Sequence, residues 1–263
     1  MLERVPTAPC PTPEQRLIAR ALQRTPVTAP APEAADYSGQ YALSGPAKVR
    51  DARITPIRGD LADIALAGKL FAPHYVVPME RMMIAPFTPL RKTPHDDAEQ
   101  TSELLLGERF MVLDIAGAWA WGYCRHDCYN GYLALDALGA PHGETPVSVP
   151  GDPVEAALAR LGTVYVWGAR GGAGIDCSGL VQTAFAHAAL ALPRDSDQQE
   201  ACGVAVQTAQ RGDLVFFPGH VAIATRADAV VHASQGKGLV TVEPLADVVA
   251  RKGKPTHIRR VLA

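Results

Sequence analysis

The sequence lacks the features that would mark a membrane protein or a nucleic-acid-binding protein. It has no run of about eighteen apolar residues, so a helix that crosses a bilayer is not expected. It also has no block of basic residues, and 25 basic against 27 acidic residues give a formal charge of −2. Because phosphate backbones are bound by clustered Lys and Arg, neither nucleic acid nor a membrane is an expected partner.

The first residues also lack the apolar run of a secretory signal. The opening stretch MLERVPTAPC is broken by prolines, and no apolar segment of a lipoprotein signal precedes Cys10. The five cysteines are an odd number and widely spaced, in a chain too large to need disulfide staples. Without an export signal, free thiols are the simpler expectation. These absences predict a soluble, cytoplasmic protein.

Length and texture predict three stretches along the chain. A chain of 263 residues can form two domains, each with its own core. Residues 1–50 are irregular, with a short helix expected over 13–24 and then a Pro- and Ala-rich run. That run is typical of an extended arm or of simple disorder.

Residues 51–140 are typical of a small β-barrel. Short strand-like runs recur at roughly ten-residue spacing, which is the pattern of a small all-β domain. Turn residues such as Gly107, Gly117 and the pair Asn130-Gly131 separate them. Residues 51–81 show a weaker pattern and are attached to the barrel as a prelude. The predicted strands are 82–84, 109–113, 119–123 and 131–133.

Residues 150–263 predict helices first and then a mainly sequential sheet, which is an α+β arrangement. Asp152 suits a helix N-cap, Pro153 suits the first helical position, and Gly162 suits the helix end. A second helix is expected from Cys177 to about residue 188, with one apolar stripe. The predicted strands are 213–217, 220–225, 229–233, 239–242 and 257–262.

Cys177 is the best candidate nucleophile among the cysteines. It stands where a glycine-rich loop, residues 168–174, runs into a helix. A cysteine in the first helical turn faces unpaired backbone N–H groups and the positive end of the helix dipole, and both favour the thiolate. The same N–H groups are suited to hold an oxyanion. The alternative is a buried cysteine that acts only as a small apolar residue.

Two histidines follow at positions suited to assist a thiol. His220 opens a predicted strand after a turn at residues 216–219, and His232 lies on the next strand. If the two strands pair, the imidazoles come within reach of each other. A thiol peptidase needs one imidazole beside the thiol and a third polar group to orient it. Taken singly, each histidine also fits a structural role.

Four linked motifs follow one another in the second half of the chain: YVWG at 165–168, DCSGL at 176–180, RGDLVFF at 211–217 and GHVAI at 219–223. Together they resemble the NlpC family of papain-like cell-wall peptidases. Order, spacing and chemistry agree with the family over roughly residues 150–263. One departure is Gly168-Ala169, where family members usually carry two glycines, and this difference bears on the shape of the loop.

The resemblance implies a fold and a catalytic set. The fold is a bacterial SH3-like barrel followed by a papain-like α+β domain with helices packed on an antiparallel sheet. The implied nucleophile is Cys177, the base is His220, and the residue that orients the base is His232. Chains of this type are similar to recycling peptidases that cleave γ-D-glutamyl–diamino acid bonds in murein peptides with a free N-terminal L-alanine. No metal or organic cofactor is implied, and the oligomeric state is not predicted.

The resemblance also implies a set of substrate-binding residues. Asp176 would bind the substrate ammonium, and Ser178 would contact the D-glutamate region. Tyr129 of the barrel matches a tyrosine that blocks one end of the cleft, and Glu103 is assigned as an accompanying acid. Two further aromatic residues from the first motif are placed at the cleft, Tyr165 beside the thiol and Trp167.

Several of these residues have simpler interpretations. Asp176 suits a helix N-cap, and Ser178 suits a plain first-turn residue. Tyr129 and Tyr132 also fit a barrel-core or turn position. The stretch around Asp195 is expected to start a helix that borders the cleft.

Two other motifs are set aside. Cys124, His126 and Cys128 lack a second ligand pair at zinc-site spacing, so no metal site is predicted. The glycine-rich loop has Cys177 where a dinucleotide fingerprint needs glycine, and no Lys follows as in a phosphate loop.

The predicted reaction is acyl transfer to water through a thioester on Cys177, with His220 as base, releasing L-Ala-D-Glu. The thiol rests either protonated or as a thiolate–imidazolium pair. Two alternatives stay open: a binding protein for wall fragments whose site is unused, and a thiol amidase or acyltransferase that acts on other amides.

Overall fold

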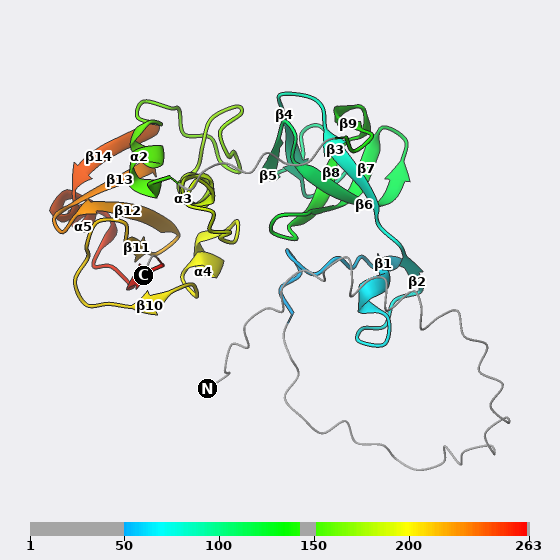
Figure 1. Ribbon diagram of the computed structural model, residues 1–263, viewed down its shortest axis with the longest axis horizontal. Coiled ribbons are helices and arrows are strands. Elements are labelled where there is room, and N and C mark those ends of the chain that lie inside the picture. Colours follow the sequence, from blue (N-terminus) through cyan, green and yellow to red (C-terminus); the bar gives the residue numbers. More distant parts are fainter. Residues whose placement is uncertain (1–49, 143–150, 262–263) are drawn as a thin grey trace, which may run out of the picture.

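The computed structural model describes residues 50–142 and 151–261, which form a barrel-like unit followed by a mixed unit of helices and sheet (Figure 1). The arm predicted for 1–50, with its helix at 13–24, lies outside the described residues apart from residue 50. Within the described ranges, no helix has the length and apolar character needed to cross a membrane.

The first unit is built on an antiparallel sheet in the order β5-β4-β8-β7-β6-β3-β9. Its core includes Met83, Leu90, Leu104, Phe110 and Leu133, all fully or almost fully buried. The predicted strands fall in β3, β6, β7 and β8, and the SH3-like fold is confirmed. The elements are β1 (Leu61–Asp63), η1 (Ile64–Leu66), β2 (His74–Val76), β3 (Met79–Met83), β4 (Phe87–Arg91), β5 (Gln100–Leu105), β6 (Arg109–Ala116), β7 (Trp119–Cys124), β8 (Asn130–Ala134), η2 (Leu135–Ala137) and β9 (Leu138–Gly139).

The second unit has a sheet in the order β10-β15-β11-β12-β13-β14, so the predicted sequential arrangement holds for its middle strands. The α+β class, with helices packed on an antiparallel sheet, is confirmed. The elements are α2 (Pro153–Leu158), α3 (Cys177–Ala186), α4 (Ser196–Gln199), β10 (Val204–Ala205), β11 (Leu214–Phe217), β12 (His220–Arg226), β13 (Ala229–Ser234), β14 (Leu239–Pro244), α5 (Leu245–Lys252) and β15 (His257–Arg260).

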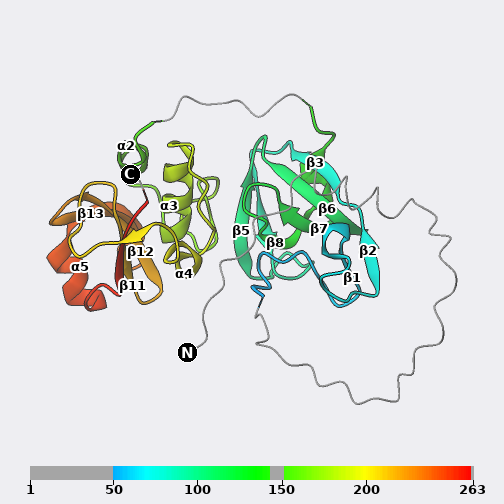
Figure 2. The same ribbon diagram turned by 60° about the horizontal axis from the view of Figure 1, so that its bottom comes forward.

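The sheet of the second unit is covered on both faces. Alternate residues of a strand point to opposite faces, and here Val221 and Ile223 pack toward α2 and α3 while Ala222 and Ala224 pack with Val248 of α5. Figure 2 shows α3 between the sheet and the barrel, with α5 on the other side of the sheet. Helix α3 is therefore placed so that its first turn faces the boundary between the two units.

Two expectations require correction. The helix predicted to reach Gly162 ends at Leu158, because the chain turns there and Gly162 adopts a positive φ of 80° three residues after the C-cap. Cys128 is disulfide-bonded, although free thiols were expected, while Cys124, Cys177 and Cys202 are free. The parity and spacing of the cysteines could not identify this bond.

Candidate active site

Cys177 is the first residue of α3, as its motif predicted. Asp176 caps the helix by accepting a hydrogen bond from the Gly179 N–H at 2.7 Å, and the Cys177 residue is only 6% exposed. The backbone N–H of Val221 is directed at the thiol. The nucleophile therefore lies against the start of β12, where His220 is located.

The two histidines lie next to each other, and a carboxylate continues the series. His220 Nε2 and His232 Nδ1 are 2.7 Å apart, and His232 Nε2 lies 2.8 Å from Glu243 Oε2. All three residues are at most 3% exposed. Strands β12, β13 and β14 pair in order, so three neighbouring strands hold His220, His232 and Glu243 in a line. Glu243 was not predicted from the sequence.

A hairpin signal could have pointed to Glu243. Two glycines at 236 and 238 mark the turn between β13 and β14, and this turn pairs His232 with Thr241. Glu243 is two residues further along β14, and residues separated by two on a neighbouring strand lie on the same face within reach of long side chains. The register, once known, therefore brings the carboxylate to the imidazole.

The charges of the site favour a neutral thiol beside a neutral imidazole. Burial raises the pKa of the Cys177 thiol to about 11, and the Asp176 carboxylate raises it further. Burial lowers the pKa of His220 to about 3, and the neighbouring His232 adds to this effect. Of the two resting states expected from the sequence, the structure favours the protonated thiol, which His220 must deprotonate as the reaction begins.

The low pKa of His220 has a consequence for stability. Between about pH 6.5 and pH 3 the unfolded chain binds a proton at His220 that the folded chain does not bind. The free energy of unfolding should therefore fall as the pH drops through this window, by about 5 kcal/mol from this residue. His220→Gln should flatten the dependence. Urea denaturation of the wild type and of His220→Gln, each at about pH 7 and about pH 4.5, measures how the free energy of unfolding of each protein changes with pH. An equal change in the two proteins would contradict the assignment.

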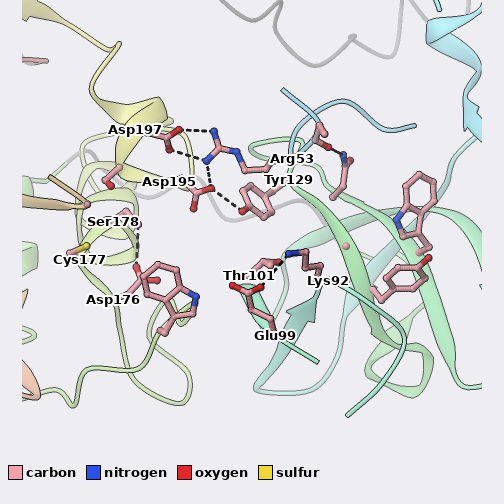
Figure 3. Close-up of a pocket in the computed structure, with 18 of the residues that line it drawn as sticks. Arg53, Lys92, Glu99, Thr101, Tyr129, Asp176, Cys177, Ser178, Asp195 and Asp197 are labelled. Atoms are coloured by element: carbon pink, nitrogen blue, oxygen red, sulfur yellow. Dashed lines mark hydrogen bonds and ion pairs between the residues drawn. The ribbon is translucent and has the colours of Figure 1, made fainter. Parts of the chain in front are cut away.

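A cavity of about 730 Å³ lies between the two units and includes Cys177 and Ser178 in its wall (Figure 3). Trp167 contributes an indole that is 60% exposed at this cavity. Tyr165 is half-buried close to Cys177, and burial raises the pKa of its hydroxyl. The barrel supplies Tyr129 to the same wall. The structure thus brings together the nucleophile and most of the predicted substrate-binding residues.

One end of the cavity carries a cluster of charges that the sequence did not reveal, which we call the Arg53 cluster. The Arg53 guanidinium binds Asp51, Asp195 and Asp197, at distances between nitrogen and oxygen of 2.7 to 2.8 Å. The Tyr129 hydroxyl donates to Asp195 Oδ2 at 2.9 Å (Figure 3). Asp195 and Asp197 line the cavity together with Arg53, so two carboxylates face one cation in this part of the wall.

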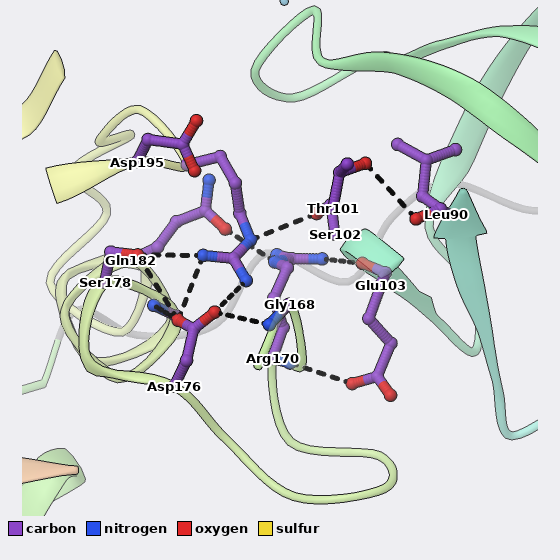
Figure 4. Close-up of polar contacts among 12 residues, drawn as sticks. Leu90, Thr101, Ser102, Glu103, Gly168, Arg170, Asp176, Ser178, Gln182 and Asp195 are labelled. Carbon is purple, nitrogen blue, oxygen red and sulfur yellow. Dashed lines mark hydrogen bonds and ion pairs between the residues drawn. The ribbon is translucent and has the colours of Figure 1, made fainter. Parts of the chain in front are cut away.

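Asp176 lines the cavity but its charge is already balanced. Arg194 binds both carboxylate oxygens, at 3.1 and 2.6 Å, and also donates to Ser178 Oγ at 2.9 Å. Asp176 accepts as well from the Gly168 N–H at 2.8 Å (Figure 4). The helix-cap role is therefore confirmed, while the ammonium-binding role stays a prediction for a carboxylate that already has a buried partner.

Glu103 has a different position from the one predicted. It is fully buried on β5, and its carboxylate accepts hydrogen bonds from the backbone N–H groups of Arg170, Gly172 and Ala173. A Cβ at Gly172 would lie 2.3 Å from Phe87, so the loop needs glycine where it meets the barrel. We therefore correct the assignment: Glu103 holds the loop that precedes Cys177 and is not part of the cavity wall.

The loop also accommodates its departure from the family pattern. Ala169 is fully buried, and it is not among the described residues with positive φ. Its methyl group therefore imposes no backbone strain. Gly168, in contrast, has a φ of 77° and a Cβ there would lie 2.6 Å from the Gln100 carbonyl oxygen. Only the first position of the pair requires glycine.

Comparison with known proteins agrees with these two units. Residues 162–256 match the NlpC/P60 family, and residues 90–138 match the bacterial dipeptidyl-peptidase SH3 domain. A protein named dipeptidyl-peptidase 6 from Lysinibacillus sphaericus is 39% identical over 95 residues, which are 35% of this chain and 35% of that protein. A gamma-D-glutamyl-L-lysine dipeptidyl-peptidase from Bacillus cereus is 31% identical over 112 residues, or 39% of this chain and 34% of the relative.

Among solved structures, an NlpC/P60 family protein from Bacillus cereus is similar at 23% identity and a TM-score of 0.41, covering 70% of this chain and 63% of the other. The chain spans about a third of the length of the curated relatives named above. Residues 162–256 belong to the NlpC/P60 family and follow a bacterial SH3 domain, and the chain is homologous to gamma-D-glutamyl-L-lysine dipeptidyl-peptidases and to endopeptidases.

Proposed function

We propose that the chain is a cysteine peptidase that hydrolyses the γ-D-glutamyl–diamino acid bond of murein peptides with a free N-terminal L-alanine. The observation that carries the proposal is the position of Cys177, which lies at a helix N-terminus beside β12 and lines a cavity walled by both units. The homology to peptidases of this bond class supports the same substrate.

The geometry suits a thioester mechanism in two steps. The Cys177 sulfur attacks the γ-carbonyl of D-glutamate while His220 takes the thiol proton, and backbone N–H groups of the first turn of α3 stabilise the oxyanion. The C–N bond then breaks, and His220 gives its proton to the departing amine. Water hydrolyses the thioester with His220 as base, releasing L-Ala-D-Glu and restoring the thiol.

The part of the cavity that Tyr129 lines suits an amino terminus. Tyr129 and the carboxylates of the Arg53 cluster lie there, and their excess negative charge favours an ammonium group. An acylated amine is uncharged, so it cannot form an ion pair with these carboxylates, and it is larger than an ammonium group. A site of this kind selects peptides that have already been released, so the proposal includes murein-peptide recycling in the cytoplasm.

The test is digestion of L-Ala-γ-D-Glu-meso-diaminopimelate beside its N-acetylated twin, followed by mass spectrometry. We expect cleavage of the free peptide at least roughly a hundredfold faster, because acetylation removes an ion pair at a desolvated site. Equal cleavage of both would leave the thiol chemistry in place but contradict the amine-reading end. If neither peptide is cleaved in a Cys177-dependent reaction under reducing conditions, a wall-fragment binding protein or an amidase for other amides becomes the better description.

A further inference from the structure

Glu243 lies at the end of a buried series of side chains that begins at His220 and continues through His232. Its carboxylate is 3% exposed, and Oε2 lies 2.8 Å from His232 Nε2. Lys237 Nζ lies 2.7 Å from Oε1 and Arg251 Nη2 lies 2.7 Å from Oε2. The two cations, together with the bond to His232, lower the pKa of Glu243 to about 2. An ionised carboxylate can accept hydrogen bonds but cannot donate them.

The ionised state of Glu243 determines which ring nitrogen carries the proton in His232 and, through it, in His220. Because Glu243 only accepts, His232 must carry its proton on Nε2. A neutral imidazole has one protonated nitrogen, so His232 Nδ1 is an acceptor. His220 must then donate from Nε2 across the 2.7 Å contact. His220 Nδ1 is consequently left without a proton and free to take one.

We propose that Glu243 is a positioning residue that selects the tautomers of His232 and His220, so that His220 Nδ1 is the base for Cys177. This inference rests on the proposed thiol chemistry but not on the identity of the peptide. With the opposite tautomers His220 Nδ1 would carry a proton and could not accept one from the thiol. Orienting an imidazole by a carboxylate is a known requirement of nucleophile–histidine pairs, and here the carboxylate acts through a second imidazole.

The two cations explain why a buried carboxylate is tolerated at this position. Lys237 and Arg251 are each about half exposed, at 48% and 46% of their side chains. They balance the charge of Glu243 from the solvent side while His232 occupies the interior side. A purely structural ion cluster would need only the cations, and it would be indifferent to which nitrogen of His232 carries the proton.

The experiment is nitrogen-15 NMR of the full chain with labelled histidine, with resonances assigned through His220→Gln and His232→Gln. We expect protons on Nε2 of both rings in the wild type. Glu243→Leu should populate the opposite tautomers, whereas Lys237→Met should keep the wild-type pattern because the bond between Glu243 and His232 remains. A proton on His220 Nδ1 in the wild type would overturn the proposal, and that outcome does not depend on whether Glu243→Leu folds.

A second readout follows the thiol itself. Iodoacetamide alkylation of Cys177, measured by mass spectrometry of its peptide, should slow at least roughly tenfold in Glu243→Leu. In that variant His220 Nδ1 carries a proton and cannot accept one from the thiol. The Cys202 peptide of the same sample is the internal control and should react at an unchanged rate. An unchanged Cys177 rate with wild-type tautomers in the variant would show that the role of Glu243 is structural only. Neither readout uses a murein peptide, so failure here is distinct from failure of the proposed substrate.

Discussion

Replacing Cys177 by Ala is expected to lower the rate of cleavage of L-Ala-γ-D-Glu-meso-diaminopimelate by roughly 10⁴-fold or more. The thiol is the atom that becomes covalently bonded to the substrate, and removing it leaves only the binding and oxyanion contributions. Helix α3 should be undisturbed, since Cys177 packs as a small residue at its first turn. Release of L-Ala-D-Glu, followed by mass spectrometry, measures the effect.

Cys202→Ala is the matched control for this experiment. Cys202 is also a free thiol with a pKa raised by burial, but it lies beyond α4 and does not line the cavity described above. We expect this variant to keep the wild-type rate. Residual cleavage by Cys177→Ala within tenfold of the wild type would contradict the assignment of the nucleophile. Loss of activity in Cys202→Ala instead would point to a general effect of thiol loss.

Arg194→Met is expected to destabilise the protein by about 3–5 kcal/mol, which is the range for breaking a buried ion pair by removing one partner. Arg194 is 1% exposed and makes two bonds to Asp176, one to Ser178 and one to Ser102 of the barrel. The variant leaves the Asp176 carboxylate buried without its cation. Urea denaturation with a fixed m-value gives the change in free energy of unfolding.

Two comparisons sharpen this prediction. Arg226→Gln removes an arginine from the ion pair with Asp228, whose side chains are 71% and 78% exposed, and we expect a change below about 0.5 kcal/mol. Combining Arg194→Met with Asp176→Asn should cost less than the sum of the single changes, because the second removes the unpaired charge. Additive losses would show that Asp176 and Arg194 do not act as a pair.

Local patterns in the sequence were sufficient to place the nucleophile. Asp176 and the glycine-rich loop fix the start of α3, and the alternation of apolar residues fixes the strands that bear His220 and His232. Helix α5 was missed because it follows β14 directly, with Pro244 at its N-cap position and no side-chain cap. Strand β4 was missed because Pro89 interrupts an otherwise weak pattern.

Contacts between distant segments could not be obtained in this way. Arg53 meets Asp195 across 142 residues of sequence, and Arg194 reaches Ser102 across 92. Such pairs depend on how the barrel docks on α3, and no local periodicity encodes that docking. The same reason explains the misplacement of Glu103, which was assigned to the substrate although its partners are loop N–H groups.

The position of Glu103 bears on how such proteins can be rearranged. The backbone that leads to the nucleophile is held partly by a side chain from the neighbouring module, through the N–H groups of Arg170, Gly172 and Ala173. Exchanging the barrel for another module would remove a wall of the cavity and, at the same time, the template on which this loop is shaped. The two modules are therefore not interchangeable parts, because the barrel supplies a side chain that shapes the backbone leading to Cys177.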